Sequence, residues 1–277
     1  MQRQSTQLPI RVGIAGFGNV GREIARRLDA GVIADMAIGG ITSGDLDKAR
    51  RNAAQLTRGA AVVTLDELAR SCEVIVECAT AHAFPAIARA ALGAGRVLIA
   101  VSAAGVPNCP ELVDLARKHG GRAIMASGAL PGLDAIRAAA EGNISAVGLR
   151  TQLRPESLAH EEAVLSRGFD FTKPPPAPVK VFEGTARDAA AAFPRHFNVA
   201  ITLSLAGIGF ERTRIEVWAD PSVPGTVHTV SVESEDVGLT LISRNRPSPT
   251  NPRTSRMVAH SVMAALRTVA SPLQVGS

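Results

Sequence analysis

The sequence predicts an α/β protein with a doubly wound parallel sheet, joined to a second, α+β part with a mixed sheet. Short apolar runs alternate with helical segments across residues 11–126, a rhythm typical of a parallel sheet with helices on both faces. A glycine-rich motif directly follows the first apolar run. After Gly132 the strand candidates lie close together with hairpin-like spacing, which favours an antiparallel or mixed sheet.

The N-terminal part contains apolar runs that we expect to form strands. They span residues 11–15, 36–41, 61–64, 73–79, 96–102 and 122–126. We expect helices between these runs. In the first of them Ile24 and Leu28 stand four residues apart, on one helical face.

Three signals indicate where helices begin. Asp45 is expected to cap the helix that follows the second strand. Thr64 and Glu67 form an S/T-x-x-E capping box. Asn108 followed by Pro110 is expected to open a further helix.

The second part mixes strands and helices. We expect strands at 144–154, 212–220, 226–234 and 238–245, and helices at 156–166, in the region ending with 198–209, and at 254–269. The Pro-rich stretch at 174–178 is expected to be an exposed loop, with a mobile flap over the site as the alternative.

Composition excludes several classes of protein. With 277 residues, 46% of them hydrophobic, the chain can bury a sizeable core. The net charge of +5 comes from scattered basic residues, which disfavours a nucleic-acid groove. Three cysteines without a C-x-x-C spacing indicate neither a disulfide framework nor a metal site. The polar N-terminus and the short apolar stretch 197–210 indicate no signal peptide and no membrane span, so we expect a cytoplasmic protein.

The glycine-rich motif has the spacing G-x-G-x-x-G between a strand and a helix. It consists of Gly16, Phe17, Gly18, Asn19, Val20 and Gly21. In the Rossmann-type dinucleotide fold the first glycine makes the tight turn, the second admits a pyrophosphate and the third lets the helix pack on the strand. The alternative is a plain glycine-rich turn, but the surrounding β–α–β rhythm favours nucleotide binding.

The residue after the second strand informs the choice between NAD and NADP. An acidic residue there would bind the ribose 2′-OH of NAD, but this chain has Ser43. Lys48, Arg50 and Arg51 lie just downstream. Because these cations are equally well explained as a solvated helix face, both NAD and NADP remain candidates for the cofactor.

Two further turns at the carboxyl ends of strands carry small residues, Ala79 and Ser102. Ligands of doubly wound sheets bind at these ends, so both residues are expected near the ribose and nicotinamide. His82 follows the first of these turns and is a candidate base, although a histidine at a helix start is more often structural.

His228 is the stronger candidate for a catalytic base. It shares one face of its strand with Val230 and Val232, which predicts that the imidazole faces inward. A buried histidine is often only a satisfied core group. However, its ordinary pKa near 6.5 suits proton transfer at an amine or at an attacking water.

Several blocks together resemble the L-aspartate dehydrogenase family. They are GIAGFGNVG at 13–21, SGALPGLDAI at 127–136, FPRHFNVAITLSLAG at 193–207, the segment 220–230, and NPRTSRMVAHSVMAAL at 251–266. The resemblance implies oxidation of L-aspartate to iminosuccinate, which hydrolyses to oxaloacetate and ammonia. It also implies a catalytic role for His228, nucleotide contacts at Ala129 and Asn198, and a homodimer.

We therefore expect three segments: a dinucleotide-binding domain at 1–130, a substrate and dimerisation domain at 131–250, and a C-terminal helix at 251–277 that returns to the first domain. The expected substrate is a small dicarboxylic amino acid. Its carboxylates need cationic side chains or backbone N–H donors, and we expect these within the second domain. The side chains to test are the arginines from Arg150 to Arg214.

The chain departs from the family pattern at one position. Where the family reads F-P-x-N-x-N-V-A, this chain has His196 in place of the first asparagine and keeps Asn198. This exchange leaves two alternatives open: a related dehydrogenase or imine reductase for another small amino acid, and a catalytically silent NAD(P)-binding sensor.

Overall fold

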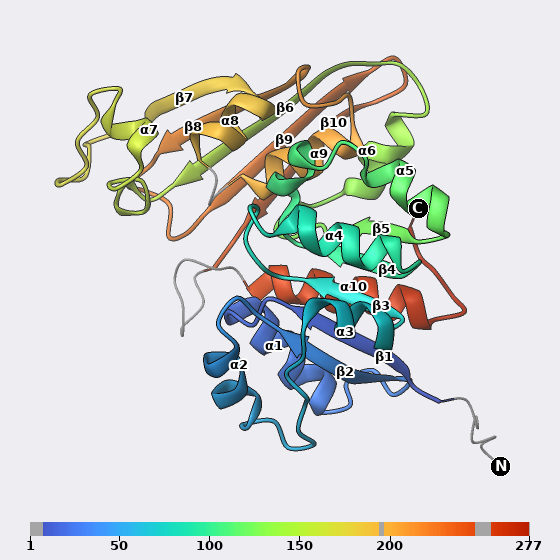
Figure 1. Cartoon of the computed structure of the whole chain (residues 1–277). Helices are drawn as coiled ribbons and strands as arrows, with labels where there is room; N and C mark the ends of the chain where they lie inside the picture. The colour runs from blue at the N-terminus through green and yellow to red at the C-terminus, as the bar shows by residue number, and fades with distance from the viewer. Residues whose placement is uncertain (1–7, 194–196, 247–255, 277) are drawn as a thin grey trace. The chain divides into compact units, whose positions relative to one another are not determined.

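A computed structural model describes residues 8–193, 197–246 and 256–276 (Figure 1). The chain divides into two compact units. Unit 1 comprises Met1–Ala126 and Val262–Gln274, and unit 2 comprises Ser127–Ser261 and Val275–Ser277. None of the helices in the described residues is long and apolar enough to span a bilayer.

Unit 1 is built on a five-stranded parallel sheet in the order β2-β1-β3-β4-β5, and this confirms the Rossmann-type prediction (Figure 1). Its strands are β1 Ile10–Ala15, β2 Met36–Thr42, β3 Val74–Glu77, β4 Val97–Ala100 and β5 Arg122–Met125. Its helices are α1 Asn19–Asp29, α2 Leu46–Ala53, α3 Leu65–Ser71, α4 Phe84–Gly93, the 3₁₀ helix η1 Ala103–Asn108 and α5 Leu112–His119. The inner strands β3 and β4 are four residues long and almost all of their residues are buried, as expected when helices cover both faces of a parallel sheet.

Two helix starts in unit 1 confirm the sequence prediction. The Asp45 side chain caps α2 by accepting a hydrogen bond from the backbone N–H of Lys48 at 2.9 Å. Thr64 and Glu67 form the predicted capping box at the start of α3. Ile24 and Leu28 of α1 are buried, as their spacing predicted.

Two local predictions in unit 1 were wrong. Residues 61–64 form no strand: Val62 makes one isolated bridge with Ile41, because Thr64 already caps α3 and turns the chain away. The helix expected to open at Asn108 begins at Leu112 instead. Asn108 ends η1, and the residue before α5 is Glu111.

Unit 2 contains a mixed sheet, as predicted, and its five strands lie in the order β10-β9-β6-β8-β7. Its strands are β6 Ile144–Leu153, β7 Val179–Thr185, β8 Thr213–Ala219, β9 Val227–Ser234 and β10 Gly238–Arg244. Strands β6 and β8 run parallel, and the other neighbouring pairs are antiparallel. The helices are α6 Leu133–Ala139, the 3₁₀ turn η2 Pro155–Ser157, α7 Glu162–Leu165, α8 Ala186–Ala192 and α9 Asn198–Ala206.

Strand β7 corrects the sequence prediction, which included its residues in a helical region. Val179 and Phe182 pair antiparallel with β8. Val181 and Phe182 are buried in the core of unit 2, and Val179 packs against it. The helix expected at 156–166 is also shorter, since only η2 and the single turn α7 are helical there. The stretch 174–178 is an exposed loop without regular structure.

Helix α10, Arg256–Ala270, forms where the C-terminal helix was expected. Val262 and Leu266 are fully buried, and Arg267 Nη2 donates a hydrogen bond to the carbonyl oxygen of Val32 at 2.8 Å. The helix therefore begins in unit 2 and ends packed in unit 1.

The sheet of unit 2 has two different faces. Alternate residues of β6 and β8, such as Leu149 and Val217, are buried in a core that also includes residues of α6, α8 and α9. The residues between them point to the other side, which we call the outer face. We define it by Arg150 and Gln152 of β6, Lys180 of β7, Glu216 and Trp218 of β8, and Ile242 of β10.

Candidate active site

The glycine motif forms a tight cradle between β1 and α1. Gly16 has φ +98°, and a Cβ atom there would lie 2.5 Å from the carbonyl carbon of Cys78. A Cβ on Gly21 would lie 2.1 Å from the carbonyl oxygen of Gly16. Gly18, by contrast, faces open space. The first and third glycines are thus required for packing, while the second leaves room for an anion at the start of α1.

A pocket of about 300 Å³ adjoins this cradle. It is lined by Phe17, Gly18, Asn19, Arg22, Ser43, Asp45, Lys48, Ala49 and Asn52. Ser43 therefore directly follows β2, as the sequence predicted, and it lines this pocket. The Asp45 carboxylate both caps α2 and contributes to the lining, so the pocket contains an anion as well as cations.

The cations of this pocket differ in part from those that the sequence indicated. Lys48 lines the pocket, but Arg51 does not, and Arg50 forms an exposed ion pair with Asp47 at 2.7 Å. Arg22 is the residue that sequence reasoning missed. It follows the last motif glycine by one position, and its Nη2 donates a hydrogen bond to Asn19 Oδ1 at 2.8 Å.

The turns after β3 and β4 are connected to each other. Ser102 is buried, and its hydroxyl donates a hydrogen bond to the carbonyl oxygen of Ala79 at 2.9 Å. Both residues thus belong to one structure at the carboxyl edge of the sheet, as the doubly wound topology requires. His82 lies in the following turn and is exposed.

His228 lies on β9 in unit 2, and its side chain faces the core together with Val230 and Val232, as predicted. Only 5% of the residue is exposed. Burial lowers the pKa of the imidazole to about 4, so the ring is neutral at neutral pH. Its Nδ1 is 3.1 Å from the Thr151 hydroxyl. Sequence reasoning missed Thr151, which stands 77 positions away and directly opposite His228 in the β6–β9 ladder.

The two other residues assigned by resemblance also lie in unit 2. Ala129 is half-buried in the turn before α6, where the backbone N–H of its neighbour Gly128 donates a hydrogen bond to Ser261 Oγ at 3.1 Å. Asn198 is the half-buried first residue of α9. His196 lies outside the described residues.

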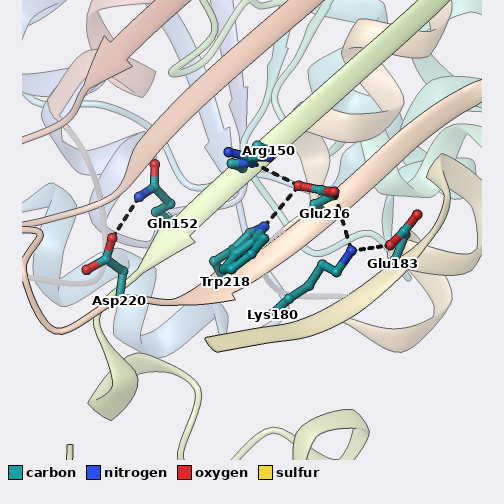
Figure 2. A network of polar contacts seen from close by, with 7 residues as sticks. All are labelled: Arg150, Gln152, Lys180, Glu183, Glu216, Trp218 and Asp220. Carbon is teal, nitrogen blue, oxygen red and sulfur yellow. Dashed lines mark hydrogen bonds and ion pairs between the residues drawn. The ribbon is translucent and has the colours of Figure 1, made fainter. Parts of the chain in front are cut away.

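A polar network occupies the outer face (Figure 2). Glu216 accepts hydrogen bonds from Arg150 Nε at 2.8 Å and from Trp218 Nε1 at 3.0 Å. Lys180 forms ion pairs with Glu183 and Glu216. Arg150 is adjacent to Thr151 in β6, so its side chain lies on the opposite face of this sheet from His228. The identity of the groups that bind the carboxylates stays a prediction.

Comparisons with known proteins identify the family. The model for the aspartate dehydrogenase C-terminal domain matches residues 134–269, and the model for the homoserine dehydrogenase NAD-binding domain matches residues 16–126. The chain is 38% identical to an L-aspartate dehydrogenase of Bradyrhizobium diazoefficiens, covering 100% of this chain and 98% of that protein. It is 37% identical to L-aspartate dehydrogenase 3 of Bordetella bronchiseptica, covering 99% and 100%.

A solved structure supports the same fold. The aspartate dehydrogenase of Thermotoga maritima matches with a TM-score of 0.71 at 22% identity, covering 96% of this chain and 99% of that one. The sequence relatives extend over the whole length and the structural match includes both units. This chain belongs to the L-aspartate dehydrogenase family.

Proposed function

We propose that this protein is an NAD(P)-dependent L-aspartate dehydrogenase. It oxidises L-aspartate to iminosuccinate, which takes up water and releases ammonia to give oxaloacetate. The observation that carries this proposal is His228: a buried, neutral imidazole on an otherwise apolar strand face, in a chain whose full length matches the family.

The cofactor site is the carboxyl edge of the sheet in unit 1. The cradle fits a pyrophosphate, because Gly18 leaves open space at the start of α1. Gly18 is also the N-cap of α1, so no side chain occupies the helix N–H groups that would bind the anion. The pocket next to it would hold the adenosine ribose, and Ser43 and Lys48 are among its lining residues. When bound, the nicotinamide supplies the acceptor for a hydride from the substrate Cα.

Cofactor choice follows from the charges in that pocket. Arg22 and Lys48 are cationic and Ser43 is neutral, whereas the carboxylate of Asp45 is already engaged by the backbone of α2. A 2′-phosphate would meet two cations and one anion there. The protein therefore uses NADP at least comparably to NAD.

His228 moves the protons of the reaction. Its Nε2 can accept a proton only if Nδ1 carries the ring hydrogen and donates it to Thr151 Oγ1. In this tautomer Nε2 takes a proton from the substrate ammonium group as the hydride leaves Cα, which produces an iminium. After His228 has released that proton to solvent, Nε2 takes another from the water that attacks the iminium carbon, which gives a carbinolamine. The imidazolium returns this proton to the amine, and ammonia leaves as the carbinolamine hydroxyl loses its own proton to solvent and becomes the carbonyl group.

His228→Ala tests this role. Loss of a general acid–base group lowers the rate by about 10²- to 10⁴-fold, so kcat should fall by this amount while the cofactor Kd stays within about twofold. The matched control is His160→Ala, which removes an exposed histidine of the same unit and should leave kcat unchanged. A folded His228→Ala protein with near-native kcat would show that the histidine is structural.

His196 favours one alternative, a related dehydrogenase for another small amino acid. A turnover screen across amino acids, carried out on the parent protein and on His196→Asn, distinguishes an aspartate dehydrogenase from a dehydrogenase for another amino acid. We expect aspartate to be the best substrate of the parent protein and of the variant. Binding of nucleotide without any change in nicotinamide absorbance would instead indicate a silent sensor.

We also propose that the protein is a homodimer that forms through the outer face of unit 2. This face carries exposed apolar surface, with Ile242 47% exposed. It also carries both charge signs, because Arg150 and Lys180 lie beside Glu183 and Glu216. A two-fold axis brings the same patch of both copies together, so a face that carries both charge signs avoids facing only like charges.

A further inference from the structure

One buried ionisable side chain in unit 1 has no part in the mechanism described so far. Glu77 is the last residue of β3, the middle strand of the parallel sheet, and none of it is exposed. Ionisable side chains are rarely buried completely unless specific partners hold them. Its position is the carboxyl edge, where a doubly wound sheet binds its nucleotide.

The partners of the Glu77 carboxylate are backbone N–H groups from two different turns. Ala79, after β3, donates to Oε1 at 2.7 Å. Ser102, after β4, donates to Oε2 at 2.9 Å, and Val101 adds a longer contact to Oε2 at 3.3 Å. One side chain thus holds together two turns that are 23 residues apart, beside the direct bond between Ser102 Oγ and the Ala79 carbonyl.

The same side chain supports the glycine cradle indirectly. The Cys78 N–H donates to the carbonyl oxygen of Ala15 at 2.7 Å. The peptide between Cys78 and Ala79 packs against Gly16 so closely that no Cβ fits between them. Because Glu77 orients the Ala79 N–H, it fixes the peptide on which the first motif glycine rests.

The chemistry of this arrangement requires a carboxylate. All of its backbone partners are donors, which suits an ionised group with two acceptor oxygens. Burial raises the pKa of the Glu77 carboxyl, and the N–H groups of Ser102 and Ala79 act in the opposite direction. An amide of the same shape would direct its NH₂ group at an N–H donor and release one of the turns.

We propose that Glu77 is a positioning residue for the nicotinamide half of the cofactor: its carboxylate fixes the turns after β3 and β4 to each other and so shapes the surface on which the nicotinamide ribose and ring lie. The proposal rests on the assignment of this edge to the cofactor. It predicts that loss of the carboxylate weakens the whole dinucleotide far more than a fragment that lacks the nicotinamide half.

Glu77→Gln tests the proposal, with Glu73→Gln as its control. Glu73 also accepts a backbone hydrogen bond, from Arg11 at 2.7 Å, but it is exposed and precedes β3, at the opposite edge of the sheet. The Kd values of NADPH and of ADP are measured by calorimetry for each protein, together with kcat for aspartate. Amide hydrogen exchange at Ala79 and Ser102 reports on the turns directly.

We expect Glu77→Gln to raise the Kd of NADPH by about tenfold or more and to lower kcat by a similar factor. The Kd of ADP should rise by a smaller factor, about threefold or less, because Glu77 supports the glycine cradle only indirectly. Exchange at Ala79 and Ser102 should accelerate. Glu73→Gln should leave both Kd values within about twofold of the parent protein. If Glu77→Gln folds and keeps the parent ratio of NADPH to ADP affinity, the proposal is overturned.

A second variant decides the matter if Glu77→Gln does not fold. Ser102→Ala removes only the hydroxyl bond to Ala79, and it should weaken NADPH relative to ADP by about threefold. An unchanged ratio in Ser102→Ala then overturns the proposal. If the parent protein itself binds NADPH no more tightly than ADP, the nicotinamide does not bind at the carboxyl edge of the sheet. The proposed role of Glu77 is then wrong as well.

Discussion

A histidine that folds without its proton makes stability depend on pH. The folded-state pKa of His228 is about 4, below the ordinary 6.5, so the unfolded chain binds more protons between these values. The neutral imidazole therefore contributes fully to the free energy of unfolding above about pH 6.5, and this contribution is lost as the pH falls toward 4. By pH 4.5 the free energy of unfolding has fallen by about 2–3 kcal/mol.

Urea unfolding at pH 7 and pH 4.5 measures this dependence. The parent protein should lose more stability than His228→Gln over this interval, by about the same 2–3 kcal/mol. His160→Gln serves as the control, since that side chain is exposed. Equal losses in the parent protein and His228→Gln would show that the imidazole titrates normally in the folded state.

The Thr151 hydroxyl lies 3.1 Å from His228 Nδ1, and we expect this contact to position the imidazole for proton transfer. Thr151→Val keeps the side-chain shape but removes the partner of Nδ1. It should lower kcat by about tenfold and cost about 1–3 kcal/mol of stability, because a buried ring nitrogen loses its hydrogen bond. Thr151→Ser should restore most of kcat. If Val and Ser at this position give the same kcat, the hydroxyl does not position the base.

Ser43 lines the pocket that we assign to the adenosine ribose. Ser43→Asp places a carboxylate beside the phosphate, so it should shift the ratio of kcat/KM for NADP over NAD toward NAD by about 10- to 100-fold. Ser43→Ala removes the hydroxyl without adding charge and should move the ratio much less. A strong preference for NAD in the parent protein would contradict the assignment of Arg22 and Lys48 to the phosphate.

At the scale of the elements, two glycines of the same motif are expected to respond differently. In Gly21→Ala the new Cβ would meet the carbonyl oxygen of Gly16 at 2.1 Å, so α1 must move from β1. We expect a loss of about 2–4 kcal/mol of unfolding free energy. Gly18 has φ −78° and open space around it, so Gly18→Ala should fold normally but bind nucleotide at least about tenfold more weakly.

Thermal unfolding and calorimetry of nucleotide binding separate the two glycine variants. Gly21→Ala should show the lower Tm, and Gly18→Ala should show a near-parent Tm with the higher Kd. Unchanged nucleotide affinity in Gly18→Ala would mean that the pyrophosphate does not approach the cradle at this residue.

At the scale of the whole molecule, the outer face of unit 2 predicts the oligomeric state. Light scattering should give twice the chain mass of 28.8 kDa for the parent protein. Trp218→Glu adds a charge next to Glu216 and should yield monomers. Arg117→Glu, which reverses a charge on α5 in unit 1, should remain dimeric. A monomeric parent protein, or a dimeric Trp218→Glu variant, would exclude this interface.

Features that depend on neighbours in the chain were predictable. The alternation of strands and helices, the capping box at Thr64 and the inward face of His228 follow from periodicities of a few residues. Strand β7 was missed because its seven residues are followed at once by the alanine-rich α8, and its identity as a strand comes from pairing with β8. The strand predicted at 61–64 does not form, although most of its residues are apolar, because pairing with β2 is limited to one isolated bridge between Val62 and Ile41.

The sequence by itself determined the fold class, the glycine cradle and the family, because each is written in local spacing or in blocks that keep their order along the chain. Only the tertiary structure decided which distant groups meet: Arg22 with Ser43 and Lys48 in one pocket, Thr151 with His228, and Glu77 with the turn at Ser102. Hydrogen bonds and charges act over a few ångströms of space and not along the chain. The partners of a buried polar group therefore become known once the strands are placed side by side.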